Sequence, residues 1–193
     1  MENICNKEMK DLSVIHSYLE TQATACFKVL YDRYVGKIFA KCISILKDEV
    51  AAQDATQEIF TKIFLNLSRF KEKARFSTWV YSITYNYCID YLRRKKKQKD
   101  LFSDDIEQVP DLAEEEVSDK IILEIELDQL EQVLQHISDS DRMVLLMKYQ
   151  DRMSIKEIAE IIDKTESAVK MKIKRAKAKA QQTREALFPQ PMV

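Results

Sequence analysis

Apolar residues recur at three- and four-residue steps over long stretches of the chain, a spacing that places them on one side of an α-helix. The first stretch extends from Phe27 to Leu46, and a second apolar stripe extends from Ala52 to Leu67. Along the second stripe, Asp54, Gln57 and Glu58 fall on a different face from the apolar residues. The pattern therefore predicts two amphipathic helices in succession.

A third helix is predicted after a short stretch rich in aromatic and basic residues. Ser77 and Thr78 are good N-cap residues, so this helix is expected to begin near them and to continue to about Lys96. Aromatic and aliphatic side chains at helical spacing usually pack inward. The core positions expected on this helix are Val80, Tyr81, Ile83, Tyr87 and Tyr91.

Shorter helices are predicted in the C-terminal part of the chain. Apolar residues from Leu123 through Leu134 to Ile137 form one helical seam. Ser138 and Ser154 each precede an acidic residue by three positions, which is the spacing of a capping box that opens a helix. We therefore expect several short helices in close succession.

The last two predicted helices have the spacing of a helix-turn-helix. A helix from about Ile155 to Ile162 precedes a break at Asp163 and Lys164, and a second helix follows Thr165, a candidate N-cap residue. The second helix of such a pair can enter the major groove of DNA. Its inward seam is expected to consist of Val169, Ile173, Ala176 and Ala180. The outward side then offers Ser167, Lys170, Met171, Lys174 and Arg175 to bases, whereas Lys172, Lys177 and Lys179 are expected to contact phosphates.

Composition supports an all-α fold. One glycine and three prolines among 193 residues leave little turn chemistry for hairpins, β-barrels or phosphate-binding loops. No apolar run approaches the ~20 residues of a membrane span, and the first residues lack the pattern of a signal peptide. We therefore expect an all-α, cytoplasmic protein.

The formal net charge of -1 conceals three blocks of different charge. The stretch 93–99 holds six basic residues, 100–119 holds nine acids and no base, and 164–184 holds eight bases and one acid. An acidic segment of this composition cannot bury enough apolar surface to offset its ordering entropy. We therefore expect two small helical domains at 1–98 and 120–188, joined by an acidic flexible linker at 99–119 and followed by a tail at 189–193.

Neither the cysteines nor the histidines suggest a metal site. Cys5, Cys26, Cys42 and Cys88 are widely spaced without a C-x-x-C pair, so free thiols are expected. No metal-ligand cluster, nucleophile arrangement or phosphate loop is visible. We therefore expect no cofactor, no metal and no enzymatic activity.

Aromatic residues between Phe70 and Tyr91 interleave with basic residues. Aromatic rings stack on unpaired bases with about 1–3 kcal/mol per base, and basic residues follow the nucleic-acid backbone. This mixture suits single-stranded or opened nucleic acid. Residues near i, i+4, i+7 spacing that are expected to share one face are Thr78 or Trp79, Ser82, Asn86 and Arg93.

These features together resemble a known family. The segments DATQEIF at 54–60, FSTWV at 76–80 and 86–94 look like region 2 of the bacterial extracytoplasmic-function (ECF) sigma factors of the sigma-70 family. The segments 155–161, 168–170 and 175–176 look like region 4 of the same family. Many members have glycine where this chain has Asp163, and aspartate tolerates a left-handed backbone better than most residues.

The resemblance implies two partners for the first domain. RNA polymerase core enzyme would be bound through its β′ clamp helices by Asp54, Gln57, Glu58 and Phe60. A flipped, unpaired base of the minus-10 promoter element would be captured by the loop from Phe70 to Phe76 and by the helix after it. The minus-10 residues implied are Arg75, Ser77, Thr78, Trp79, Ser82, Asn86, Arg93 and Arg94.

For the second domain the resemblance implies binding of the minus-35 promoter element as duplex DNA. The residues implied are Thr165, Ser167, Lys170, Met171, Lys172, Lys174 and Arg175. The acidic linker would extend toward the RNA exit path of polymerase, and an anti-sigma factor would be a further partner.

The sequence therefore favours a transcription initiation factor that binds core RNA polymerase and directs it to promoters. The alternative is a conventional helix-turn-helix regulator with a helical N-terminal domain and no polymerase docking. The Asp54, Gln57 and Glu58 face and the aromatic and basic stretch argue against that alternative.

Overall fold

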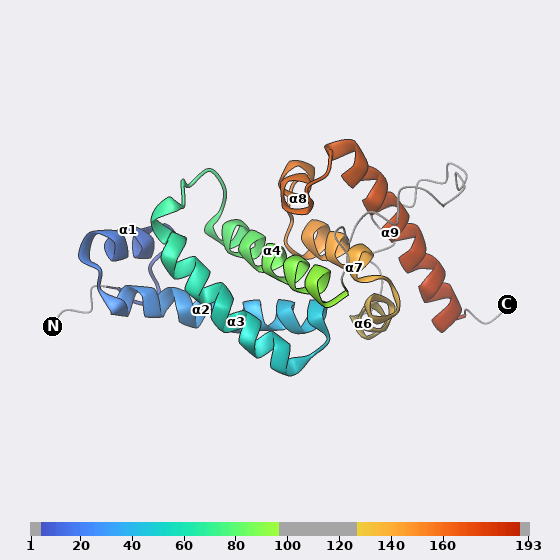
Figure 1. The fold of residues 1–193 in the computed structure, drawn as a ribbon, viewed down its shortest axis with the longest axis horizontal. Helices are drawn as coiled ribbons and strands as arrows, with labels where there is room; N and C mark the ends of the chain where they lie inside the picture. The colour runs from blue at the N-terminus through green and yellow to red at the C-terminus, as the bar shows by residue number, and fades with distance from the viewer. Residues whose placement is uncertain (1–4, 97–126, 190–193) are drawn as a thin grey trace. The chain divides into compact units, whose positions relative to one another are not determined.

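The regular elements of the chain are helices throughout the ranges 5–96 and 127–189, which the computed structural model describes. They belong to two units, Met1–Lys97 and Gln98–Val193, called unit 1 and unit 2 below. The predicted all-α fold is confirmed (Figure 1). The expected linker at 99–119 and the seam residue Leu123 lie outside the described residues, as do residues 190–193 of the expected tail.

Unit 1 is built around one long helix, α2, which contacts the other three. Its elements are α1 (Asp11–Thr21), α2 (Thr24–Leu46), α3 (Glu49–Asn66), a 3-10 turn (Leu67–Arg69) and α4 (Phe76–Lys96). Helix α2 contacts α1, α3 and α4, and α3 also contacts α4. Side chains buried in this core include Leu30, Ile38, Ile45, Ile59, Ile63 and Ile89.

The two predicted amphipathic helices correspond to α2 and α3. Most residues of the apolar stripes are buried in both helices, but Phe27, Val35 and Phe39 are half-buried, and Tyr31 and Phe64 are 42% and 47% exposed. Their rings still pack on neighbours, since Tyr31 lies 4.6 Å from Phe60 and Phe64 lies 5.0 Å from Phe27 between ring centroids. The periodicity therefore predicted the helices correctly and overstated the burial of their edges.

Helix α4 has a different core register from the expected one. It begins at Phe76, because the Arg75 carbonyl already accepts the Trp79 N–H at 3.1 Å, and it ends at Lys96 as expected. Val80 is buried, but Tyr81, Ile83, Tyr87 and Tyr91 are only half-buried. The fully buried positions are instead Tyr85, Cys88, Ile89 and Leu92, and Cys88 faces Cys42 of α2 with the sulfurs 4.0 Å apart. The tyrosines were misplaced because they lie at the edges of this buried stripe.

Helix α1 was not among the predicted elements. Val14, Ile15 and Tyr18 are buried, and the Asp11 carboxylate at the helix start is bound by two residues of α2. Arg33 contacts one Asp11 oxygen at 2.5 Å, and the Tyr34 hydroxyl donates to the other at 2.5 Å. Burial raises the pKa of Tyr34, and its hydrogen bond to Asp11 raises it further. The spacing of Asp11, Val14, Ile15 and Tyr18 was the sequence signal for this helix.

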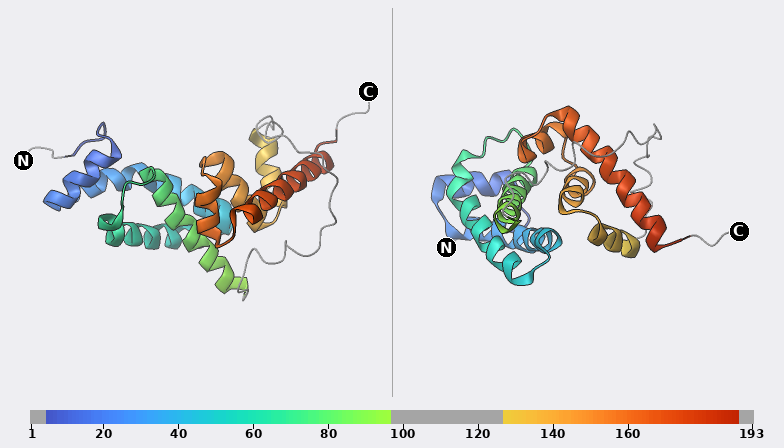
Figure 2. Two further views of the ribbon diagram at one scale, coloured as in Figure 1. Left: turned by 90° about the horizontal axis from the view of Figure 1, so that it is seen from above. Right: turned by 45° about the vertical axis from the view of Figure 1, so that its right-hand side comes forward.

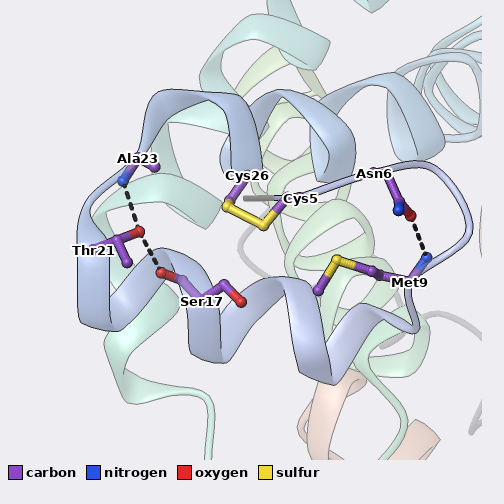
Figure 3. The surroundings of a disulfide bond; sticks show 7 residues. All are labelled: Cys5, Asn6, Met9, Ser17, Thr21, Ala23 and Cys26. Atoms are coloured by element: carbon purple, nitrogen blue, oxygen red, sulfur yellow. Dashed lines mark hydrogen bonds between the residues drawn. A yellow bond between two sulfur atoms is a disulfide. The ribbon is translucent and has the colours of Figure 1, made fainter. Parts of the chain in front are cut away.

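Two of the four cysteines are not free thiols, so that expectation was wrong for them. Cys5 and Cys26 form a disulfide with the Cα atoms 5.0 Å apart (Figure 3). The chain reverses at Gln22, whose φ is 54°, so α1 and α2 run side by side, and the segment before α1 returns toward the start of α2. Asn6 supports that segment by accepting the Met9 N–H at 3.1 Å. Sequence spacing carried no sign of this pairing, whereas Cys42 and Cys88 are free as expected.

Unit 2 consists of short helices that pack along one long helix (Figure 2). Its elements are α6 (Leu127–His136), α7 (Asp139–Leu145), a π-type turn (Leu146–Gln150), α8 (Ile155–Ile162) and α9 (Glu166–Leu187). Helix α9 contacts α6, α7 and α8. The predicted seam of α9 is confirmed, since Val169, Ile173, Ala176 and Ala180 are all buried.

The turn between α8 and α9 has the predicted helix-turn-helix form. Ser154 and Glu157 form a complete capping box at the start of α8. Asp163 ends α8 in the left-handed conformation with φ 57°, so it takes the place that glycine often holds. The Thr165 hydroxyl accepts the Ala168 N–H at 3.2 Å and so caps α9. These local signals explain why the break was predictable to the residue.

Every helix in the part of the chain that the structure describes is too short or too polar to cross a lipid bilayer.

Candidate nucleic-acid interface

The polar face of α3 is exposed and separate from the core of unit 1. Asp54, Gln57 and Glu58 are all exposed, while Ala55 and Thr56 between them are buried. Three- and four-residue spacing places the polar groups along one side of the helix. We call Asp54, Gln57 and Glu58 the α3 polar face.

Phe60, the fourth residue of the expected polymerase-binding set, does not belong to the α3 polar face. Its side chain is 7% exposed, and its ring packs 4.6 Å from that of Tyr31 on α2. Helical geometry explains the difference, because Phe60 points toward α2 when Gln57 and Glu58 point away from the core.

The loop between α3 and α4 is anchored by aromatic rings. Phe70 and Phe76 stand at its two ends with their centroids 5.3 Å apart, and each lies within 5.6 Å of the Trp79 ring. Phe76 is also in edge contact with Tyr34 of α2 at 5.4 Å. Aromatic pairs in such geometries add about 0.5–1.5 kcal/mol each beyond their area burial. The loop ends are therefore fixed to the core of unit 1.

Exposed cations follow this loop. Arg69, Lys71, Lys73 and Arg75 are all exposed. Glu72 interrupts them with a left-handed backbone, φ 56°, and its carboxylate lies 2.6 Å from His16 Nε2 of α1. We call residues 69–75 the basic loop. Sequence reasoning missed the contact with His16, since 56 residues separate the partners.

Only some of the expected minus-10 residues are exposed on α4 and the basic loop. Arg75, Asn86 and Arg94 are exposed, whereas Ser77, Thr78, Trp79, Ser82 and Arg93 are half-buried. The Ser82 hydroxyl donates to the Trp79 carbonyl at 2.8 Å, and Arg93 lies 3.8 Å from Asp90. The exposed residues therefore offer one guanidinium group at the end of the basic loop, from Arg75, and an amide and a second guanidinium group further along α4, from Asn86 and Arg94.

The outward side of α9 is polar and basic near its start. Ser167, Lys170 and Met171 are exposed, together with the N-cap residue Thr165. Lys174 and Arg175 are half-buried one turn further along. A helix that presents this side beyond a helix-turn-helix break has the shape of a DNA recognition helix.

Lys172, which was expected to contact phosphate, is buried in unit 2. It is 8% exposed, with its ammonium 2.9 Å from Asp141 Oδ1 and 3.0 Å from the Ser140 hydroxyl. Burial lowers the pKa of Lys172 to about 7, and the neighbouring Lys179 and Arg175 cations act in the same direction. The Asp141 carboxylate opposes this shift, because it stabilises the charged ammonium.

Lys179 shares the same carboxylate. Its ammonium lies 3.0 Å from Asp141 Oδ2, and its side chain is 39% exposed. Lys172 and Lys179 both lie beside the buried seam of α9, on the side that faces α7.

Among residues 5–96 and 127–189, no group of three or more histidine, cysteine, aspartate or glutamate side chains is placed to hold a metal ion.

Comparison with known families covers both units. Residues 30–98 match the family model of Sigma-70 region 2, and residues 127–179 match that of Sigma-70 region 4. The ECF RNA polymerase sigma factor SigW of Bacillus subtilis is 30% identical over 160 residues, which span 78% of this chain and 84% of that protein. The chain belongs to the ECF sigma factors.

Other relatives agree with that assignment. The RNA polymerase sigma-H factor of Pseudomonas aeruginosa is 26% identical to this sigma factor over 158 residues, 78% of this chain and 82% of that protein. Two solved structures share the fold, each with a TM-score of 0.58. One is the sigma factor RpoE in complex with the anti-sigma factor NepR from Bartonella quintana, at 18% identity over 85% of this chain and 98% of that one. The other is CnrH with the cytosolic domain of CnrY, at 21% identity over 91% and 97%.

This sigma factor is therefore a transcription initiation factor that directs RNA polymerase to promoters, and it is not an enzyme. The alternative of a conventional regulator fails, because residues 30–98 match region 2 rather than an unrelated dimerisation or effector domain.

Proposed function

We propose that this sigma factor binds core RNA polymerase through the α3 polar face. The observation that carries the proposal is that Asp54, Gln57 and Glu58 are exposed together on a helix whose other side is buried. Two carboxylates and an amide suit a partner helix that carries basic and polar side chains. The proposed partner is the clamp helix pair of the β′ subunit.

We further propose that the basic loop and the start of α4 hold an unpaired base of the minus-10 element. The half-buried Trp79 ring lies beside Phe70 and Phe76 at the end of the loop, so a base has an aromatic platform near four exposed cations. Asn86 would bond a base edge, and Arg75, Arg93 and Arg94 would follow the backbone. Ser77, Thr78 and Ser82 would line the same surface.

The minus-35 element is proposed to be bound as duplex by the outward side of α9. Ser167, Lys170, Met171, Lys174 and Arg175 would reach the major groove near the helix start, with Thr165 at the N-cap. Lysine lacks the bidentate fork of arginine, so we expect Arg175 to carry more of any guanine recognition than Lys170 or Lys174.

We also propose a cytoplasmic location and an anti-sigma partner. Polymerase and promoter DNA lie in the cytoplasm. Of the two solved neighbours, RpoE is in complex with the anti-sigma factor NepR, and CnrH is in complex with the cytosolic domain of CnrY. A partner of this kind would lower promoter-directed transcription when added to the holoenzyme and would leave elongation by core polymerase unchanged.

Binding of core polymerase tests the α3 polar face. Fluorescently labelled full-length protein is titrated with core enzyme, and Asp54→Ala/Glu58→Ala is expected to weaken binding by about tenfold or more, as for loss of interface charge pairs. The matched control is Glu8→Ala/Glu20→Ala, which also removes two exposed carboxylates from unit 1. Equal losses in both variants would indicate a general charge effect and would exclude the α3 polar face as the docking surface.

A further inference from the structure

A single buried carboxylate connects α7 to the recognition helix. Asp141 is 0% exposed, and its Oδ2 accepts the Ser138 hydroxyl at 2.7 Å at the start of α7. The same carboxylate lies 2.9 Å from the Lys172 ammonium and 3.0 Å from the Lys179 ammonium, both on α9. Asp141 therefore accepts a hydrogen bond at its own helix cap and lies within ion-pair distance of two points of α9.

The two lysines are spaced to fix the rotation of α9. Seven residues separate them, which is about two helical turns, so both point to the same side of the helix. Lys172 also donates to the buried Ser140 hydroxyl at 3.0 Å. A helix held at two points along its length can neither rotate nor slide against α7 without breaking an ion pair.

The side of α9 away from this attachment carries Ser167 and Lys170, two of the proposed DNA contacts. Ser167 and Lys170 lie about 140° and about 160° around the helix from Lys172, Met171 lies about 100° away, and all three are exposed. Their direction is therefore determined by how α9 sits on α7. A small rotation would move these side chains out of register with base edges, on which sequence readout depends.

We propose that Asp141 and Lys172 are positioning residues for minus-35 recognition, and that Lys172 contributes to DNA binding through Asp141 rather than through a phosphate. The inference rests on the proposed role of α9. Both residues are buried, so each would support DNA recognition without contacting DNA.

Removal of charge distinguishes positioning from direct contact. Deleting an acid from a DNA-binding domain strengthens DNA binding if only the overall charge matters. Positioning by Asp141 requires the opposite sign, because Asp141→Asn breaks the attachment of α9. A lysine that neutralises a phosphate also contributes about 0.9 to the slope of log affinity against log salt, whereas a positioning lysine contributes nothing to that slope.

The experiment measures binding of a promoter fragment by the reconstituted holoenzyme over a series of KCl concentrations. Asp141→Asn and Lys172→Met are each expected to weaken binding by about tenfold, in the middle of the range for coupled neighbours, with an unchanged salt slope. The double variant Asp141→Asn/Lys172→Met is expected to lose less than the product of the two single losses. Lys170→Met, on the outward side of the same helix, is the control and is expected to reduce the slope by about 0.9.

Two results overturn the proposal. One is tighter binding by Asp141→Asn, and the other is a loss of salt slope in Lys172→Met equal to that in Lys170→Met. If a variant proves unfolded by circular dichroism, Lys179→Met provides the test, since this half-exposed lysine shares the same carboxylate. Lys179→Met is then expected to weaken promoter binding without changing the salt slope. A salt slope reduced as much as in Lys170→Met would again overturn the proposal.

The failure of the proposed role of α9 would be visible separately. In that case promoter binding would be unchanged in Lys170→Met and in every Asp141 or Lys172 variant. The attachment of α9 to α7 would then be tested by a double-mutant cycle on the free energy of urea unfolding. Additive losses in Asp141→Asn and Lys172→Met would show that the two residues do not interact and would overturn the attachment.

Discussion

The two surfaces proposed to meet promoter DNA are held in place by different forces. In unit 1 the basic loop is fixed by a cluster of aromatic rings, with Phe76 at its centre and 4% exposed. In unit 2 the recognition helix α9 is attached to α7 by a buried carboxylate and two lysines. Aromatic packing depends little on salt or charge, whereas a buried ion pair fails when either partner is removed. The two units should therefore respond to different perturbations.

The largest effect is expected from the aromatic cluster. Phe76→Ala removes a buried ring that contacts Tyr34, Phe70 and Trp79, so it is expected to lower the free energy of unfolding by about 3–5 kcal/mol. Urea unfolding measures this, with Phe64→Ala as the control at a ring that is 47% exposed. Equal losses of unfolding free energy in the two variants would show that Phe76 is not the centre of the aromatic cluster.

A smaller loss is expected when the disulfide of unit 1 is removed. Cys5 and Cys26 are separated by 21 positions, so closing this loop stabilises the folded state by about 3 kcal/mol in the chain-entropy model. Cys5→Ser/Cys26→Ser is expected to show that loss in urea unfolding with or without reductant. Dithiothreitol is expected to reduce the stability of the natural protein to the same level, and no effect of reductant on it would show that the bond does not contribute.

Lys172→Met is expected to destabilise unit 2 by about 2 kcal/mol, because Asp141 stays buried with one of its two cations missing. Lys170→Met changes an exposed lysine on the same helix and is expected to stay within about 0.5 kcal/mol. Thermal unfolding followed by circular dichroism compares them. Similar losses in the two variants would contradict a structural role for Lys172.

The smallest effect is expected at the His16 and Glu72 contact that joins α1 to the basic loop. Both side chains are about half exposed, at 55% and 45%, so His16→Ala is expected to lower stability by less than about 1 kcal/mol. Hydrogen exchange of the loop amides is the sensitive measurement, and faster exchange confined to residues 71–74 is expected. Unchanged exchange there would show that the contact does not hold the loop.

The sequence was most informative where local rules decide the structure. Asp163, Thr165 and the Ser154 capping box set the helix-turn-helix through contacts within a few residues, so the break before α9 could be read directly. Hydrophobic periodicity likewise predicted α2 and α3. The α3 polar face followed from the same periodicity.

Long-range pairing was invisible to that reasoning. Lys172 was expected to contact phosphate because its sequence position shows a positive charge but not its partner. That partner, Asp141, lies 31 positions earlier and was interpreted only as a capping residue. The Cys5 and Cys26 bond and the Tyr34 contact with Asp11 were missed for the same reason. The core register of α4 was wrong because tyrosine packs well both inside and at the edge of a core.

Run-off transcription tests whether this sigma factor directs core RNA polymerase to promoters. Purified core RNA polymerase is incubated with a library of promoter fragments, with and without this sigma factor and with its Asp54→Ala/Glu58→Ala variant. We expect transcripts that start at defined sites only when the sigma factor is present, and fewer of them with the variant. Core polymerase that neither binds nor responds to the protein, while the protein alone shifts duplex DNA, would contradict this expectation.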